Sequence, residues 1–286
     1  MFALVLWTLS ALLAHAPTGQ ADNEQQNPLF DSLLDPGLEL GPGLWAKLPP
    51  PTMPDGLGAA EQREIISALI RDDYSYEDFT RKSSVAPHRL RIRDVTPSHH
   101  EAPARSVDVW FVAHDHKFAG WLMSAAKGAG MGKALKKEHL EKRGFGSAGG
   151  PPEAYRHVEF DLLGKVHLRA TVRMMLTRTK SSVLVAAEVD PRFLDDPEFP
   201  NQWQPIVGKG DARKLGQAKP WRGGGFYLKV TRLAEPTGAV FVEQHVIFAE
   251  PTGWFDGANL LRSKLPLVVE NRVRVTRQNW AKAGAR

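Results

Sequence analysis

A run of alternating apolar and polar residues near the middle of the chain, residues 166–176, constrains the fold more than any other stretch. Successive side chains of a β-strand point to opposite faces, so the alternation predicts a strand with one buried and one solvated face. Such strands are typical of antiparallel sheets. The predicted core-facing residues are Val166, Leu168, Ala170, Val172, Met174 and Leu176, and the predicted solvent-facing ones are Lys165, His167, Arg169, Thr171 and Arg173.

Further stretches with strand patterns make a sheet the main element of the chain. They are dense in β-branched and aromatic residues, and segments rich in glycine, proline or serine separate them. The turn Glu235-Pro236-Thr237-Gly238 joins the last two as a hairpin. These predicted strands cover residues 89–95, 106–113, 158–163, 182–189, 225–233 and 239–249.

The last part of the sequence, residues 254–282, is amphipathic with helical spacing. Pro266 interrupts the pattern, so we expect a kink there or two shorter helices. Because an amphipathic helix needs an apolar surface to cover, we predict an α+β fold in which an antiparallel β-sheet packs against a long C-terminal helix. The apolar positions of this helix are Trp254, Ala258, Leu261, Leu265, Val268, Val269 and Val273.

The N-terminal region predicts export. Residues 2–14 form an apolar run of the length found in signal peptides, which is too short to span a bilayer comfortably. Small residues at Gly19 and Ala21, followed by polar ones, predict cleavage at about residue 21. We therefore expect a periplasmic or secreted protein. The alternative is a protein anchored to the membrane by an uncleaved N-terminal segment, because no Lys or Arg precedes the run.

Proline and glycine are frequent in residues 22–57, where we expect no regular element. This segment is predicted to be a linker, or an extended arm that lies against a surface through its leucines and Trp45. Residues 59–71 then form a short amphipathic helix. We assign residues 1–21 to a signal peptide, residues 22–57 to the linker or arm, and residues 58–286 to a single α+β domain.

Composition excludes several classes of function. The chain has a net charge of +5 and no cysteine, so disulfides, thiolate metal sites and cysteine nucleophiles are impossible. Its basic residues are not interleaved with aromatic ones in a dense block, so we expect no nucleic-acid partner. The basic face of residues 127–143 indicates a solvated surface, or else peripheral contact with an anionic membrane or envelope surface.

No motif indicates a catalytic or metal site. The glycine-rich segment 127–134 lacks the spacing of a phosphate-binding loop. The clusters His99-His100-Glu101 and His114-Asp115-His116 do not supply the three or four convergent ligands that zinc needs. The acidic residues of segment 195–198 adjoin in one loop, whereas paired catalytic carboxylates face each other across a cleft. We therefore expect no metal, no cofactor and no catalytic residue.

Aromatic residues supply the candidate binding site. A long insertion without regular periodicity, residues 192–225, carries two of them, and loops of such length are often functional. If the insertion folds over the sheet, its aromatics and those beside the C-terminal helix line the mouth of an apolar pocket. The alternative is that they pack in the core or in a lid. The candidate ligand-binding residues are Trp203, Trp221, Tyr227, Trp254 and Phe255, with Arg222 or Arg262 as a polar contact.

The order of elements over residues 106–282 resembles that of helix-grip, or START-like, domains. In those domains an early strand, helices, a run of antiparallel strands and a long C-terminal helix enclose a cavity. Pro266 and the insertion of residues 192–225 depart from that pattern. The resemblance implies a cavity for a lipid or another apolar molecule, although a fold alone does not define a function.

These patterns leave three functions open. The leading hypothesis is an exported, non-enzymatic binding module that holds a lipid or other apolar small molecule between the sheet and the C-terminal helix. The second is an envelope hydrolase whose acid and base groups converge only in the fold. A cleft that joins His114 or His116 to a carboxylate with a perturbed pKa would favour this hypothesis. The third is a structural or adaptor protein of the cell envelope that uses the basic face and the arm.

Overall fold

The computed structural model of the protein describes residues 27–95, 104–114, 132–145, 153–208, 210–255 and 260–284. The predicted signal peptide, the cluster His99-His100-Glu101, Asp115, His116 and residues 127–131 of the basic segment lie outside these residues. Within the described ranges, no helix is both long and apolar enough to cross a membrane.

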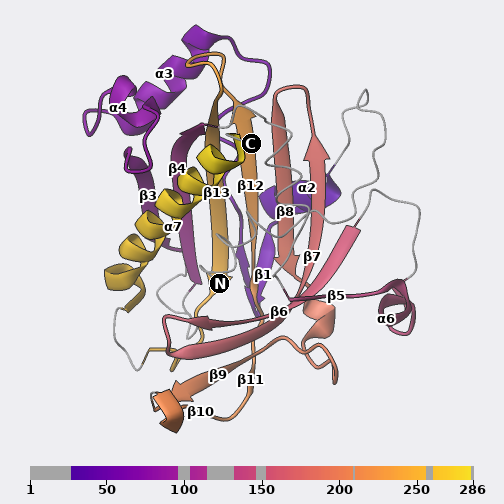
Figure 1. Ribbon diagram of the computed structural model, residues 1–286. Helices are drawn as coiled ribbons and strands as arrows, with labels where there is room; N and C mark the ends of the chain where they lie inside the picture. Colours follow the sequence, from indigo (N-terminus) through magenta and orange to yellow (C-terminus); the bar gives the residue numbers. More distant parts are fainter. Residues whose placement is uncertain are drawn as a thin grey trace.

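A large antiparallel sheet forms the body of the molecule, as predicted (Figure 1). Its main path runs β10-β9-β7-β8-β12-β13-β4-β3, while β6 and β5 continue from β7 and β11 pairs with β9. The insertion of residues 192–225 was expected to lack regular structure, but it contains three of these strands. The strands are β3 (His88–Asp94), β4 (Ala104–His114), β5 (Lys133–Ala134), β6 (Glu153–Leu162), β7 (Val166–Arg178), β8 (Ser182–Val189), β9 (Gln202–Val207), β10 (Lys214–Leu215), β11 (Lys219–Pro220), β12 (Gly224–Arg232) and β13 (Ala239–Ala249).

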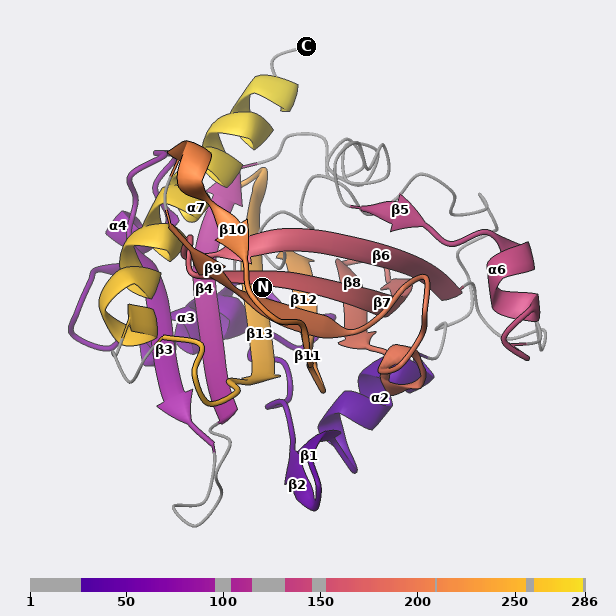
Figure 2. The same ribbon diagram turned by 90° about the horizontal axis from the view of Figure 1, so that it is seen from below.

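Strand β7 is where the sheet curls. One of its edges pairs with β6 along the strand. Its other edge is shared: Arg169 lies opposite Gln202 of β9, and Val172 lies opposite Val189 of β8. Because two strands divide one edge, the direction of the sheet changes there, and Figure 2 shows β6, β7 and β9 running across the direction of β13 and β4.

The inner face of the curled sheet packs against α7 (Leu260–Gly284). This is one helix that continues through Pro266, so the expectation of two shorter helices is wrong. A proline there removes one backbone hydrogen bond, while apolar burial stabilises the helix by about 25 cal/mol per Å². The residues of α7 that pack into the core are Leu261, Leu265, Val269, Val273 and Trp280.

The outer face of the sheet is also covered, so the prediction of one solvated face is wrong for the central strands. All residues of β13 are buried, as are those of β12 up to Thr231. In β7 the predicted solvent-facing Thr171 is buried, whereas His167, Arg169 and Arg173 are partly exposed. Alternation identifies the more apolar face of a strand, but it does not exclude that other segments cover the second face.

Residues 27–57 form a packed arm on this outer face, which corrects the expectation that they hold no regular element. They contain α2 (Pro28–Leu34) and a hairpin of β1 (Leu38–Gly41) and β2 (Leu44–Ala46). Pro28 is the first residue of α2, and Gly37, with a φ of 98°, lies between α2 and β1. Proline and glycine therefore mark the ends of regular elements here. Trp45 is 55% exposed, whereas the leucines of the arm pack onto the sheet beside Tyr227 and Ile247.

Two further helices cover the rest of the outer face beside the arm. α3 (Ala59–Ile70) confirms the helix predicted at residues 59–71, and α4 (Tyr76–Thr80) follows it. Their buried residues contact Trp110 and Phe241 of the sheet. The remaining short elements are α6 (Lys137–Glu141) and the 3₁₀ turns η1 (Pro191–Phe193) and η2 (Gly210–Ala212).

Candidate functional site

Four of the predicted ligand-binding residues meet in the inner core. The ring of Trp254 lies 6.3 Å from that of Trp203, 6.0 Å from that of Trp221 and 6.0 Å from that of Phe255, between centroids. All four side chains are at most 5% exposed, and Trp221 donates its indole N–H to the carbonyl of Ala249. The structure thus brings these four residues together as packing partners within the core.

The other two predicted residues lie elsewhere. Tyr227 of β12 faces the outer side of the sheet, where its hydroxyl donates to the carbonyl of Pro49 at 2.9 Å. Arg262 lies on the exposed face of α7 and pairs with Asp94 of β3 at 2.6 Å. Because neighbouring residues of a strand point to opposite faces, Phe226 and Leu228 join the inner core while Tyr227 faces away from it.

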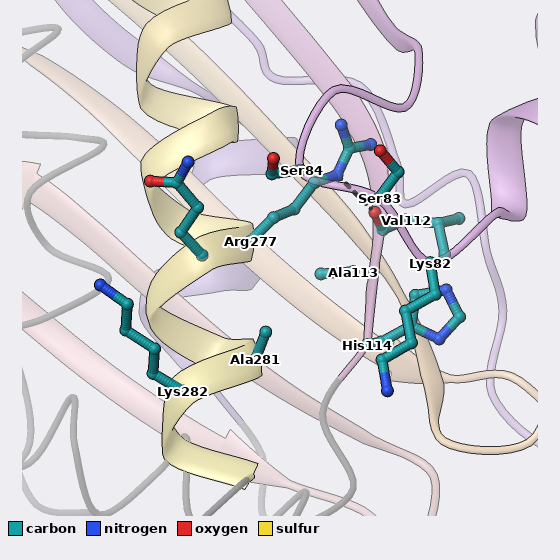
Figure 3. Close-up of a pocket in the computed structure, with 10 residues that line it drawn as sticks. Lys82, Ser83, Ser84, Val112, Ala113, His114, Arg277, Ala281 and Lys282 are labelled. Atoms are coloured by element: carbon teal, nitrogen blue, oxygen red, sulfur yellow. Dashed lines mark hydrogen bonds between the residues drawn. The ribbon is translucent and has the colours of Figure 1, made fainter.

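A pocket of about 370 Å³ lies between the last turns of α7, the end of β4 and the segment that follows α4 (Figure 3). Small apolar residues form part of its lining, namely Val112 and Ala113 of β4 and Ala281 of α7, although the Val112 side chain itself packs in the outer-face cluster beside Trp110 and Phe241. None of the six predicted ligand-binding residues lines it, and no acidic residue in the described part of the chain does so. The charged and hydroxyl-bearing residues that line it are Lys82, Ser83, Ser84, His114, Arg277 and Lys282.

Arg277 holds the walls of this pocket together. Its Nε–H donates to the carbonyl of Val112 at 2.8 Å, one Nη–H donates to that of Pro87 at 2.8 Å, and the other Nη donates to that of Ala86. The side chain is 6% exposed and lies 5.5 Å from the ring centroid of Phe111. One guanidinium therefore ties α7 to β4 and to the segment before β3.

The charge of Arg277 is costly to bury. Burial lowers the pKa of Arg277 to about 10, and the neighbouring positive charge of Arg81 contributes to this lowering. Its hydrogen-bond acceptors are neutral carbonyls, and in the described parts of the chain no carboxylate forms an ion pair with it. The guanidinium is thus satisfied in hydrogen bonding while its charge is not neutralised.

Histidine 114 forms the end of the β4 wall. His114 was part of a proposed acid–base pair, and the structure places its Nε2 2.8 Å from the carbonyl oxygen of Thr80. Figure 3 shows His114 and Lys82 on the wall opposite α7, with Arg277 reaching from the helix towards Ser83 and Ser84. The pocket therefore combines an apolar wall with cationic and hydroxyl groups, which suits an amphipathic molecule.

A second polar cluster lies on the opposite face of the sheet, beneath the arm. His245 of β13 lies directly across from Asp108 of β4 in the strand register, and its Nδ1 is 2.9 Å from the Asp108 carboxylate. Its Nε2 is 3.4 Å from Glu243, two residues away on the same face. Each of the three side chains is at most 1% exposed. We call Asp108, Glu243 and His245 the buried triad.

The arm is fastened to the buried triad by backbone hydrogen bonds. Glu243 accepts hydrogen bonds from the N–H groups of Thr52 at 2.6 Å and Met53 at 3.2 Å. Lys229 of β12 donates to the carbonyl of Met53 at 2.7 Å and pairs with Asp55 at 3.1 Å. These contacts attach the arm to the sheet, and we call the two side chains that make them, Glu243 and Lys229, the clasp.

The buried triad favours a charged imidazole. Burial by itself lowers the pKa of His245, but the hydrogen bonds from the ring to Asp108 and Glu243 outweigh it and raise the pKa above its usual value. The two carboxylates that flank His245 carry one more negative charge than the imidazolium neutralises, and Arg93, which pairs with Asp108 at 2.9 Å, balances it. An imidazolium held between two carboxylates adds to the clasp.

The acidic loop of residues 195–198 belongs to an ion pair. Arg143 donates to both carboxylate oxygens of Asp196, at 2.5 and 2.9 Å, and these bonds hold the pKa of Asp196 at about 2. Across the described ranges, no group of three His, Asp or Glu side chains is placed to hold a metal ion.

Comparison with known proteins adds little to this geometry. No family model matches the chain, and no curated protein matches it. A solved structure of an uncharacterized protein from Rhizobium leguminosarum is similar over 68% of this chain and 99% of its own, with 13% identity and a TM-score of 0.28. A likeness at that score supports no inference about fold or function.

The sequence contained one signal for the pocket that the aromatic pattern obscured. Arg277 follows Val273 by four residues and precedes Trp280 by three, so it lies on the apolar stripe of the helix. An arginine on such a stripe is a buried cation, and buried cations are paired or extensively hydrogen-bonded. The carbonyls that Arg277 binds belong to residues about 165 to 191 positions away, and helical spacing does not reveal them.

Proposed function

We propose that this protein is a non-enzymatic binding module that holds one small amphipathic molecule between the sheet and the C-terminal helix. The observation that carries the proposal is the pocket of about 370 Å³ between α7 and β4, with an apolar wall and a polar rim. Ligand pockets of proteins are concave, largely apolar and about 300–1,000 Å³ in volume. Contact with the apolar wall would retain the ligand, and the polar groups would set its orientation.

The proposal puts the ligand at the C-terminal end of α7. The inward residues Val166, Leu168, Val172 and Leu261 are buried at 4% exposure or less and pack into one core. The middle of the seam between sheet and helix is therefore occupied by side chains. A ligand held between the sheet and α7 would therefore lie at the end of this contact, where α7 leaves the sheet and Ala281 faces Ala113.

Native mass spectrometry tests the proposal directly. The mature protein, purified from its own host, should carry an extractable amphipathic molecule at about one per chain. Ala281→Phe puts a ring into the pocket and should abolish the added mass, because the volume lost is comparable to that of a ligand fragment. Asn279→Phe, on the exposed side of the same helical turn, is the matched control and should keep it. An unliganded mass that stays unchanged after incubation with host lipids would refute the proposal.

We propose further that the protein is exported after cleavage of residues 1–21. The support is the apolar run of residues 2–14 followed by small residues at the cleavage position. The intact mass of the protein from its host should then correspond to a chain that begins at Asp22. A mass that includes residues 1–21 in a membrane fraction would favour the uncleaved anchor.

A further inference from the structure

We propose that the ligand of the pocket carries a carboxylate or phosphate group, which the cationic residues of the pocket bind. This inference rests on the proposed function and names the class of its ligand. Among the described residues, those that line the pocket include Lys82, Arg277 and Lys282 but no acid. An amphiphile with an anionic head would therefore meet opposite charge at its head and apolar surface along its chain.

The charge of Arg277 is the strongest argument. A buried cation is ordinarily neutralised by a carboxylate, and the described acids leave this one unneutralised. The effect reaches a neighbour: burial, and then the charge of Arg277, lower the pKa of His88. Glu270 opposes this lowering at His88, but it does not line the pocket. A bound anion would supply the negative charge that the described residues do not place there.

The hydroxyl groups of the pocket complement this charge. Ser83 and Ser84 lie on the segment that Arg277 approaches in Figure 3. The Ser83 oxygen accepts a hydrogen bond from the backbone N–H of Val85 at 3.3 Å, which leaves its own O–H able to donate. Two hydroxyls beside a cation resemble the donors that proteins direct at carboxylate and phosphate oxygens.

The helix dipole provides a competing explanation for the cations. The pocket adjoins the C-terminal end of α7, and that end carries a partial negative charge that favours nearby lysine and arginine. The dipole amounts to about half an elementary charge. Arg277 and Lys282 together exceed it about fourfold, so the helix end by itself does not neutralise them.

Titration calorimetry with amphiphiles of equal chain length tests the inference. The delipidated mature protein would be titrated with dodecanoate, dodecyl phosphate, the neutral 1-lauroylglycerol and inorganic phosphate. We expect both anionic amphiphiles to bind about tenfold or more tightly than the neutral one, a difference of about 1.4 kcal/mol. Raising the salt from about 50 to 500 mM should narrow this difference, because exposed charges are screened.

Substitutions in the rim give a second readout that leaves Arg277 in place. The double variant Lys82→Gln, Lys282→Gln should weaken both anionic amphiphiles about fivefold and leave the neutral one unchanged. Lys264→Gln, on the exposed face of α7 away from the pocket, is the matched control and should change neither.

The outcomes separate this inference from the proposed function. Equal affinity for the anionic and neutral amphiphiles would overturn the anionic head and leave the binding module standing. Failure of all three amphiphiles to bind would overturn the module itself. Inorganic phosphate that binds as tightly as dodecyl phosphate would also overturn the inference as stated, because the apolar wall would then contribute nothing.

Discussion

Arg277 combines two roles that different residues usually fill. Its three hydrogen bonds join α7 to the sheet, and we propose that its buried charge, which no described carboxylate pairs with, attracts an anionic ligand. Both roles follow from one placement, an arginine on the apolar stripe of a helix that passes carbonyl groups of β4 and of the segment before β3. Lysine offers a compact ammonium in place of the planar fork and would not reach three carbonyls at once.

Replacing Arg277 by methionine should lower the free energy of unfolding by about 2–4 kcal/mol. Methionine keeps the packing of the stem but leaves three carbonyls without their donor, two of which accept at 2.8 Å. Arg277→Lys should fall between methionine and the native residue. Urea unfolding followed by circular dichroism measures the change.

The control for this series is Arg274→Met. Arg274 is exposed one turn earlier on the same helix and donates to Asn271. Its loss should alter stability by no more than about 0.5 kcal/mol, as is usual for surface positions. Equal effects at the two positions would contradict the structural role given to Arg277.

The arm and strands β4, β12 and β13 behave as one electrostatic unit. Glu243 and Lys229 bind the backbone of the arm. His245 lies between the carboxylates of Glu243 and Asp108 and contacts both. Trp110 adds an indole N–H bond of 2.9 Å to the Thr52 hydroxyl, and its ring meets His245 edge-on. Charges buried between two elements in this way bind them strongly only while each charge keeps its partner.

The stability of the protein should therefore fall as the pH rises above about 6.5, the ordinary pKa of an unfolded histidine. The pKa of His245 is raised in the folded state, so its contribution is complete below the unfolded pKa and is lost as the pH passes the folded one. The slope reaches at most about 1.4 kcal/mol per pH unit for one proton. The charged groups facing His245 that set this behaviour are Asp108, Glu243, Lys229, Arg93 and Asp55.

Urea midpoints between pH 5.5 and 9 measure this dependence, and hydrogen exchange at Thr52 and Met53 localises it to the arm. His245→Gln should flatten the slope, because glutamine does not ionise. His139→Gln, in α6 and remote from the triad, should keep it. A slope that survives in His245→Gln would assign the pH dependence to another group.

The whole molecule is a sheet with apolar cover on both faces. α7 closes the inner face, while the arm, α3 and α4 close the outer one. A sheet whose two faces are both buried gains roughly twice the apolar burial of a half-solvated sheet. Segments more than two hundred residues apart in sequence, such as the arm and β13, thereby belong to one folding unit.

Removing one arm side chain should destabilise the entire chain. Leu33 of α2 is 0% exposed where the arm packs on the sheet, and Leu33→Ala should lower the free energy of unfolding by about 2–4 kcal/mol in a single transition. Leu267→Ala, at a position 61% exposed on α7, should change it by less than about 0.5 kcal/mol. Two separate transitions, or a neutral Leu33→Ala, would mean that the arm is attached loosely.

The sequence by itself determined the long strands and two of the helices. Alternation placed the strands that became β3, β4, β6, β7, β8, β12 and β13, and helical spacing placed α3 and α7, because both periodicities follow from local backbone geometry. Alternation within β12 also puts Tyr227 on the face opposite to Phe226 and Leu228, and the prediction that grouped Tyr227 with the inner aromatic residues did not use this parity.

Only the tertiary structure decided which polar residues became buried and what covers each face. The pairing of His245 with Asp108 depends on strand register across 137 positions, and the pocket depends on the distance at which α7 leaves β4. The arm has the composition of a spacer, yet it packs, because the sheet offers an apolar face and the side chains of the clasp. Such contacts are non-local, and a periodicity within one segment carries no information about the segment that will meet it.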